Sequence, residues 1–81
     1  MYATSWCGDC ALARRFLKAR NLAFRERDVD EDAAAESVIL SHNGGARLLP
    51  VFECDGRLLT LAPFDRRRLS AWLAEVGGPG A

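Results

Sequence analysis

Two cysteines three residues apart, Cys7 and Cys10, lie where a short apolar segment gives way to a helical pattern. Residues 1–5 can form only a short strand. The apolar positions that follow recur at the spacing of one helical face: Leu12, Ala13, Phe16 and Leu17. Unpaired backbone N–H groups and the positive end of the helix dipole favour thiolate over thiol at a helix start. The sequence therefore predicts a reactive thiol pair between the first strand and the first helix.

The middle of the chain predicts a second strand and a second helix. Residues 22–29 alternate in part between apolar and charged side chains, as in a strand with one solvated face. Asp30 or Asp32 is expected to cap the helix that follows. That helix carries residues 38–40 inward and ends at residues 43–45, which read Asn-Gly-Gly.

The last third of the chain predicts a β-hairpin and a third helix. Two apolar runs, 48–54 and 57–61, flank an Asp-Gly pair suited to a type I′ turn. Pro50 cannot donate to a strand ladder, so it must begin its strand or lie at an edge. Asp65 is expected to be the N-cap of the last helix. The apolar stripe of that helix comprises Leu69, Trp72, Leu73 and Val76.

The predicted order is β-α-β-α-β-β-α. The first strand, helix and second strand should form a right-handed parallel unit, to which the hairpin adds two antiparallel strands. The expected fold class is α/β, with a single four-stranded mixed sheet and three helices on its faces. With 81 residues, the chain has room for one domain, 1–81, whose residues 76–81 we expect to be a frayed tail.

Charge and hydropathy exclude several classes of partner. Eleven basic and eleven acidic residues give a formal net charge of zero, so no basic field is available to recruit nucleic acid. No apolar run approaches the roughly 18 residues that a membrane span needs. The first three residues lack the features of a signal peptide. We therefore expect a cytoplasmic protein, monomeric, with no membrane or nucleic-acid partner.

The cysteine count separates redox chemistry from metal binding. Three cysteines do not suit a secreted disulfide scaffold. A zinc site normally has four ligands, and the possible set here is Cys7, Cys10, Cys54 and His42. The sequence has no second paired motif to match Cys7 and Cys10, so the indication of a zinc site is weak. We expect no metal, although a small module using Cys7, Cys10 and His42 stays an alternative. Cys54 is expected to be a small buried hydrophobe.

The pair therefore has two distinct roles in thiol–disulfide exchange. Cys7, nearer the strand end and more exposed, is predicted to be the nucleophile that attacks a substrate disulfide. Cys10, one helical turn later and more buried, is predicted to be the resolving thiol that attacks Cys7 and releases the reduced substrate.

The chain resembles the glutaredoxins, and most closely the small actinobacterial-type members called mycoredoxins. The segments that carry the resemblance are Tyr2-Ala3-Thr4-Ser5-Trp6-Cys7-Gly8-Asp9-Cys10, Asp28-Val29-Asp30, Asn43-Gly44-Gly45-Ala46-Arg47-Leu48-Leu49-Pro50 and the hairpin Asp55-Gly56. The resemblance implies a thioredoxin fold, cytosolic thiol–disulfide exchange and a cis Leu49–Pro50 bond. It also implies that the backbone of Leu49 pairs with the bound thiol or peptide.

The resemblance points to further substrate contacts and to an electron source. Trp6 is expected to form an apolar lip for a partner or to pack partly into the core. Arg47 is expected to hold a substrate carboxylate or to be a solvated loop residue. Where glutathione-using members carry a carboxylate clamp, this chain reads Leu-Ala-Pro-Phe-Asp over 61–65, which favours a capping role for Asp65.

The predicted function is reduction of protein disulfides or of mixed disulfides between proteins and low-molecular-weight thiols. Glutathione, mycothiol or thioredoxin reductase would supply the electrons, and no cofactor is expected to stay bound. The alternative is an iron–sulfur cluster bridged between two protomers, which Gly8, directly after the first cysteine, would permit.

Overall fold

The computed structural model describes residues 1–77 and contains one mixed sheet with three helices. The elements, in chain order, are β1 (Tyr2–Ala3), α1 (Gly8–Ala19), β2 (Arg27–Asp28), α2 (Ala33–His42), β3 (Val51–Cys54), β4 (Arg57–Thr60) and α3 (Arg66–Val76). This order confirms the predicted β-α-β-α-β-β-α pattern. None of the helices in this part of the chain is long and apolar enough to cross a membrane.

The strands are arranged in the order β2-β1-β3-β4. β1 pairs in parallel with β2, and Tyr2 of β1 pairs antiparallel with Val51 of β3. β3 and β4 form the predicted hairpin, in which Asp55 and Gly56 have φ of 52° and 80°. Positive φ at both central positions is what a type I′ turn requires, so this prediction is confirmed.

The second strand is much shorter than the sequence pattern predicts. Only Arg27 and Asp28 pair with β1, whereas the alternating pattern predicted a strand over 22–29. β1 itself has only two residues, so it offers pairing partners to only two residues of the second strand. The preceding residues, 22–26, are therefore irregular.

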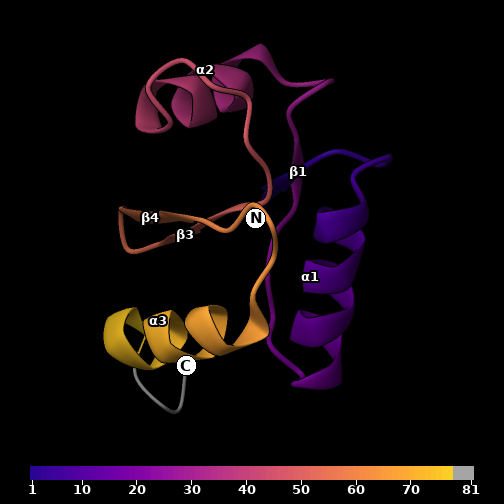
Figure 1. Cartoon of the computed structure of the whole chain (residues 1–81), viewed down its shortest axis with the longest axis vertical. Helices are drawn as coiled ribbons and strands as arrows, with labels where there is room; N and C mark the ends of the chain where they lie inside the picture. Colours follow the sequence, from indigo (N-terminus) through magenta and orange to yellow (C-terminus); the bar gives the residue numbers. More distant parts are fainter. Residues whose placement is uncertain (78–81) are drawn as a thin grey trace.

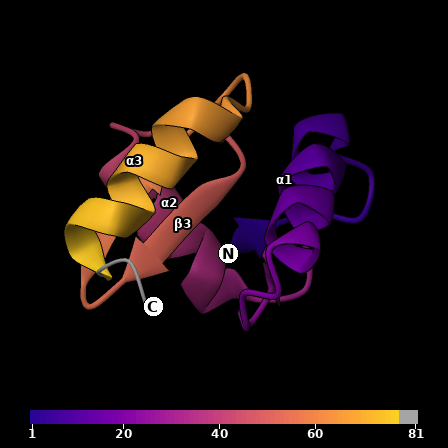
Figure 2. The same cartoon turned by 90° about the horizontal axis from the view of Figure 1, so that it is seen from below.

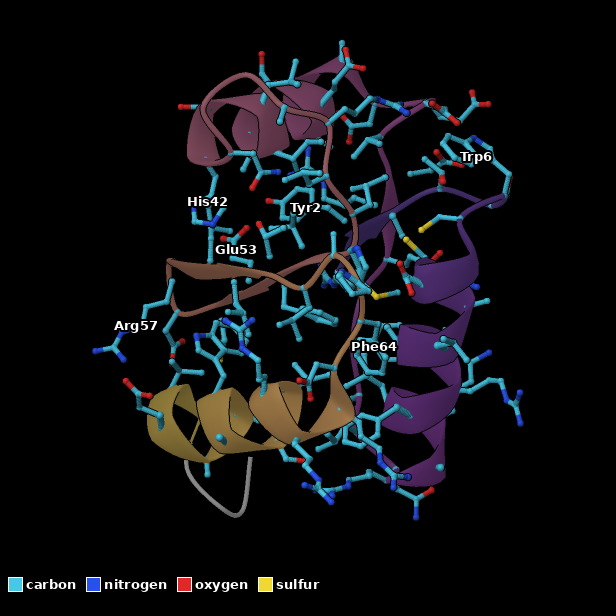
Figure 3. The ribbon with its side chains drawn as sticks, in the orientation of Figure 1. Tyr2, Trp6, His42, Glu53, Arg57 and Phe64 are labelled. Carbon is cyan, nitrogen blue, oxygen red and sulfur yellow. The ribbon has the colours of Figure 1, made fainter. Side chains whose placement is uncertain are left out.

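Helices cover both faces of the sheet (Figure 1). α2 lies on one side of the β3–β4 hairpin and α3 on the other. Seen from below, α3 crosses over β3, with α1 beside it (Figure 2). Phe64, which Figure 3 shows between α3 and α1, contacts Phe16 of α1 and Phe52 of β3, with ring centroids 6.0 and 6.4 Å apart. This aromatic cluster packs α1 and α3 on the same face.

The helix caps agree with the sequence prediction. Asp32 is the N-cap of α2 and accepts a hydrogen bond from the Ala35 N–H, and Asp65 caps α3. Val76 is the last residue of α3, and Gly77 is its C-cap. The remainder of the predicted frayed tail, residues 78–81, lies outside the described residues.

The core lies between the sheet and the helices. Its fully buried side chains include Ile39 of α2, Val51 of β3 and Leu69 of α3. The interpretation of Cys54 as buried is wrong, since this side chain is only half-buried next to the hairpin turn. The prediction that residues 38–40 point inward holds for Ile39, which is fully buried, and for Val38, which is partly buried against the core. Leu40 is only half-buried, because a helix turns its successive side chains about 100° apart.

Candidate functional site

The cysteine pair is built on the first turn of α1. Cys7 is the N-cap, with the extended φ and ψ of −78° and 118° typical of that position, and Gly8 begins the helix. The Cys7 Sγ accepts a hydrogen bond from the backbone N–H of Cys10 at 3.2 Å. Sulfur thus takes the place of the oxygen that usually caps a helix. This contact and the positive end of the helix dipole both stabilise negative charge on the Cys7 sulfur.

The two thiols differ in their access to solvent. Cys7 is half-buried, whereas Cys10 is completely buried. Burial raises the pKa of Cys10 to about 12, and a hydrogen bond with Cys7 adds to this shift. A hydrogen bond from the Thr4 backbone, which favours the thiolate, offsets only part of it. Cys10 is therefore held as a neutral thiol beside the accessible sulfur of Cys7.

The segment before β3 lies next to the segment that carries Cys7. Because Tyr2 pairs antiparallel with Val51, Leu49 and Pro50 run alongside the segment that leads from β1 to Cys7. The Leu49–Pro50 bond is cis, as the resemblance implied. Pro50 is fully buried and lies directly before β3, which starts at Val51. The predicted position of this proline at the start of its strand therefore agrees with the structure to within one residue.

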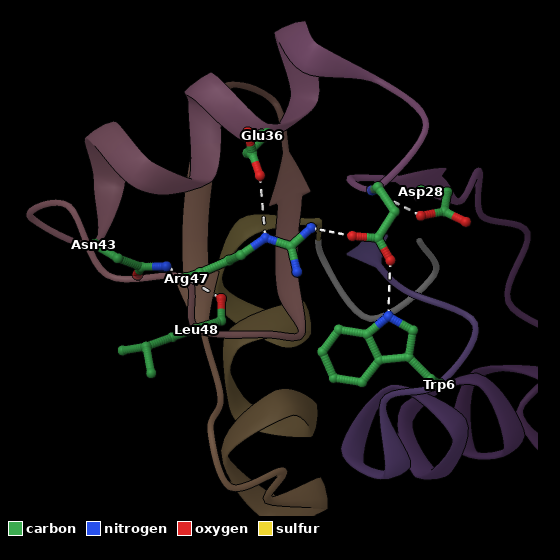
Figure 4. Close-up of polar contacts among 7 residues, drawn as sticks. Trp6, Asp28, Glu36, Asn43, Arg47 and Leu48 are labelled. Carbon is green, nitrogen blue, oxygen red and sulfur yellow. Dashed lines mark hydrogen bonds and ion pairs between the residues drawn. The ribbon is translucent and has the colours of Figure 1, made fainter.

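Trp6 and Arg47 are joined through a third residue (Figure 4). The Trp6 indole Nε1 donates to Oδ2 of Asp30 at 2.7 Å, and Nη2 of Arg47 donates to Oδ1 of the same carboxylate. Arg47 Nε also donates to Glu36 at 3.1 Å. The Trp6 side chain is 69% exposed and projects beside the first turn of α1, so its packing into the core is excluded (Figure 3).

Arg47 is an exposed residue in a segment without regular structure, as the solvated-loop expectation has it. Its guanidinium also pairs with Asp30 and Glu36, two partners that neither expectation included. Sequence reasoning did not identify these two acidic residues as part of the site. The sequence predicts Asp30 as a possible cap of α2, a role that Asp32 fills, and places it in one of the segments that carry the resemblance.

Comparison with known proteins places this geometry in a family. A family model described as Glutaredoxin matches residues 1–59. “Putative glutaredoxin Rv3198A” of Mycobacterium tuberculosis strain H37Rv is 35% identical over 79 residues, covering 96% of this chain and 92% of that protein. The chain belongs to the glutaredoxin family. Glutaredoxins are thiol–disulfide oxidoreductases, so it is an enzyme of that class.

Solved structures agree with the fold of this glutaredoxin. The crystal structure of the thioredoxin-like protein BC3987 superposes with a TM-score of 0.71 at 30% identity, covering 86% of this chain and 92% of that one. A mutant of the same protein gives 0.73 at 32% identity, covering 89% and 93%. The predicted thioredoxin fold is therefore confirmed.

Asp65 of this glutaredoxin serves as a helix cap. Its Oδ1 accepts hydrogen bonds from the backbone N–H groups of Arg67 and Arg68, at 2.9 and 3.1 Å. The carboxylate is thus used within the chain, which confirms the capping role that the sequence favoured.

The alternative metal site is not assembled. Among residues 1–77 no three His, Cys, Asp or Glu side chains gather closely enough to hold a metal ion. His42 is the last residue of α2, and Figure 3 shows it on the opposite side of the molecule from Trp6, the neighbour of Cys7.

One buried residue near the cysteines was not anticipated. Thr4 is 1% exposed, and its hydroxyl makes no hydrogen bond with the described residues. An unsatisfied hydroxyl normally costs free energy, so its presence beside the thiol pair is unusual. A threonine next to a strand gives no sequence signal of this kind.

Proposed function

We propose that this glutaredoxin reduces protein disulfides, or mixed disulfides between proteins and low-molecular-weight thiols, through Cys7 and Cys10. The observation that carries the proposal is the half-buried Cys7 sulfur, which accepts the Cys10 N–H at the start of α1. That placement supports a thiolate that a substrate can reach.

The first step is attack of the Cys7 thiolate on one sulfur of the substrate disulfide. A Cys7–substrate disulfide forms, the substrate S–S bond breaks, and the leaving thiolate takes a proton from solvent. Cys10 then loses its proton and attacks the Cys7 sulfur. This forms the Cys7–Cys10 disulfide and releases the second substrate thiol, so two electrons pass from the dithiol to the substrate.

Burial of Cys10 supports its role as the second thiol. Its neutral form does not compete with Cys7 for the substrate, because the thiolate is the nucleophile in exchange. Two electrons from glutathione, mycothiol or thioredoxin reductase then restore the dithiol. Cytoplasmic action is part of the proposal, since that compartment keeps thiols reduced.

Trp6, Arg47, Leu49 and Pro50 are proposed to form the substrate contact surface. The exposed indole of Trp6 supports a role as an apolar lip next to the nucleophile. Leu49 has its side chain buried, which leaves its backbone as the group able to pair with a substrate. Leu48, whose side chain is 45% exposed, adds apolar surface on the same segment.

A coupled turnover assay tests the proposal, with each electron source supplied in turn. Cys7→Ser should lose activity on all disulfides. Cys10→Ser should keep activity on a glutathionylated peptide, where a second thiol from solution can complete the cycle, and lose it on the disulfides of insulin. Full turnover by Cys7→Ser would overturn the proposal. A coloured, iron-containing dimer after purification would instead favour cluster binding.

A further inference from the structure

Asp30 uses both carboxylate oxygens to join two parts of the site. Oδ2 accepts the Trp6 indole N–H at 2.7 Å, and Oδ1 accepts the Arg47 guanidinium (Figure 4). Trp6 precedes the nucleophilic Cys7, and Arg47 precedes the Leu49–Pro50 segment. These partners are 24 and 17 residues away in sequence, so one side chain links the segment that leads into Cys7 to the segment that leads into β3.

The backbone of Asp30 is firmly anchored. Its N–H donates to Oδ1 of Asp28 at 2.9 Å, and the preceding residue, Val29, donates its N–H to the Ala3 carbonyl at 3.0 Å. Val29 is also buried in the core. The Asp30 backbone is therefore attached to the sheet, so its carboxylate can hold the side chains of Trp6 and Arg47 in place.

Trp6 and Arg47 depend on this anchor because little else holds them. The Trp6 side chain is mostly exposed, so packing does not select its rotamer. Arg47 lies in a segment without regular structure, and its other polar contact is Glu36. Free rotation of both side chains would have to be lost when a substrate binds, which weakens binding.

We propose that Asp30 is a positioning residue, which holds Trp6 and Arg47 in the arrangement that receives a disulfide substrate at Cys7. The inference rests on the proposed function and adds to it the residue that organises the contact surface. Asp30 itself does not touch the reacting sulfurs. Its removal should therefore raise KM for a protein disulfide and leave kcat nearly unchanged.

A double-mutant cycle tests the proposal. Asp30→Asn and Trp6→Phe are made singly and together, and KM and kcat are measured with the disulfides of insulin. Each single variant should raise KM about three- to tenfold, as expected when one partly exposed charged hydrogen bond is lost or weakened. The double variant should raise KM about as much as Asp30→Asn alone, because Trp6→Phe removes a contact that the loss of the Asp30 charge has already weakened.

A fluorescence measurement separates positioning from stability. In a Trp72→Phe background Trp6 is the remaining tryptophan, and its anisotropy should fall when Asp30 becomes Asn. Glu31→Gln is the matched control: it removes one charge from the adjacent residue, which makes no ion pair with the described residues, and should change neither KM nor anisotropy.

Two results would overturn the inference: an unchanged KM in Asp30→Asn, or multiplicative effects of the two substitutions. Neither result affects the proposed function, which fails only if the wild-type protein turns over no disulfide or Cys7→Ser retains activity. If Asp30→Asn folds poorly, Trp6→Phe alone still tests the contact through KM.

Discussion

The backbone N–H of Cys10 points at the Cys7 sulfur, 3.2 Å away, while the side chain of Cys10 is completely buried one turn into α1. A single helical turn thus gives two identical side chains opposite properties. The Cys7 sulfur is half-buried and accepts an N–H at the start of a helix, whereas the Cys10 thiol is held neutral by burial. This difference supports the proposed order, in which Cys7 attacks first and Cys10 second.

Selective alkylation should report this difference. Because the pKa of Cys10 is raised from 9.0 to about 12, its thiolate fraction at pH 7 is about a thousandfold below that of an ordinary thiol. Iodoacetamide should label Cys7 and Cys54 first in the reduced native protein. Labelling of Cys10 should accelerate about tenfold per pH unit up to that pKa. Peptide mapping by mass spectrometry measures all three sites.

Unfolding provides the control for that experiment. In guanidinium chloride the burial of Cys10 is lost, so its labelling rate should approach that of Cys54. Equal labelling of Cys10 and Cys54 in the native protein at pH 7 would contradict the assignment.

An ion pair ties α1 to the irregular segment before β2. Arg14 donates two hydrogen bonds to the Glu26 carboxylate, at 2.7 and 2.6 Å, and the pKa of Glu26 is lowered chiefly by this contact. Glu26→Gln should lower the free energy of unfolding at pH 7 by about 0.5–1 kcal/mol, because both side chains are partly exposed. Urea denaturation measures the change, with Glu31→Gln as the control.

The pH dependence of that difference has a definite sign. A lowered folded-state pKa means that the stabilisation is present above the ordinary Glu26 value of 4.5 and is lost as the pH falls through the folded value. The gap between wild type and Glu26→Gln should therefore close in acid. A gap that stays constant down to pH 3 would show that packing, not the ion pair, causes it.

Features determined by local geometry could be predicted from the sequence. Asp55 and Gly56 form the expected turn because its two central residues need positive φ, and Asp65 caps α3 because a short acceptor suits a helix start. Cys7 is placed at the start of α1 by the same kind of local reasoning. These assignments depend on neighbours within a few residues.

Features that depend on distant residues could not be predicted. The length of β2 is set by its two-residue partner β1. The alternating pattern of residues 22–29 carries no information about the length of that partner. The partners of Arg47 lie 11 and 17 residues away, and charged side chains are common enough that no pattern singles out Asp30 and Glu36. The site's polar contacts therefore needed the fold.

The role of Asp65 can be tested separately from catalysis. Asp65→Ala removes the acceptor for two N–H groups of α3 and should lower the free energy of unfolding by about 1 kcal/mol. Asp65→Ser should recover most of that loss, since serine is also a good N-cap. Both variants should keep the KM for a glutathionylated peptide. A large rise in KM in the stable Asp65→Ser variant would reveal a substrate clamp instead.

Because the hydroxyl of Thr4 has no hydrogen-bond partner among the described residues, we expect its removal to stabilise the protein. Valine has nearly the same shape as threonine without the polar group, so Thr4→Val should raise the free energy of unfolding by about 1 kcal/mol. Thr60 is the matched control, because its hydroxyl donates to Oδ1 of Asn43 at 2.7 Å. Thr60→Val should therefore lower stability by a similar amount. Parallel urea denaturation of the two reduced variants measures both changes, and an equal loss in each would mean that the Thr4 hydroxyl has a partner after all.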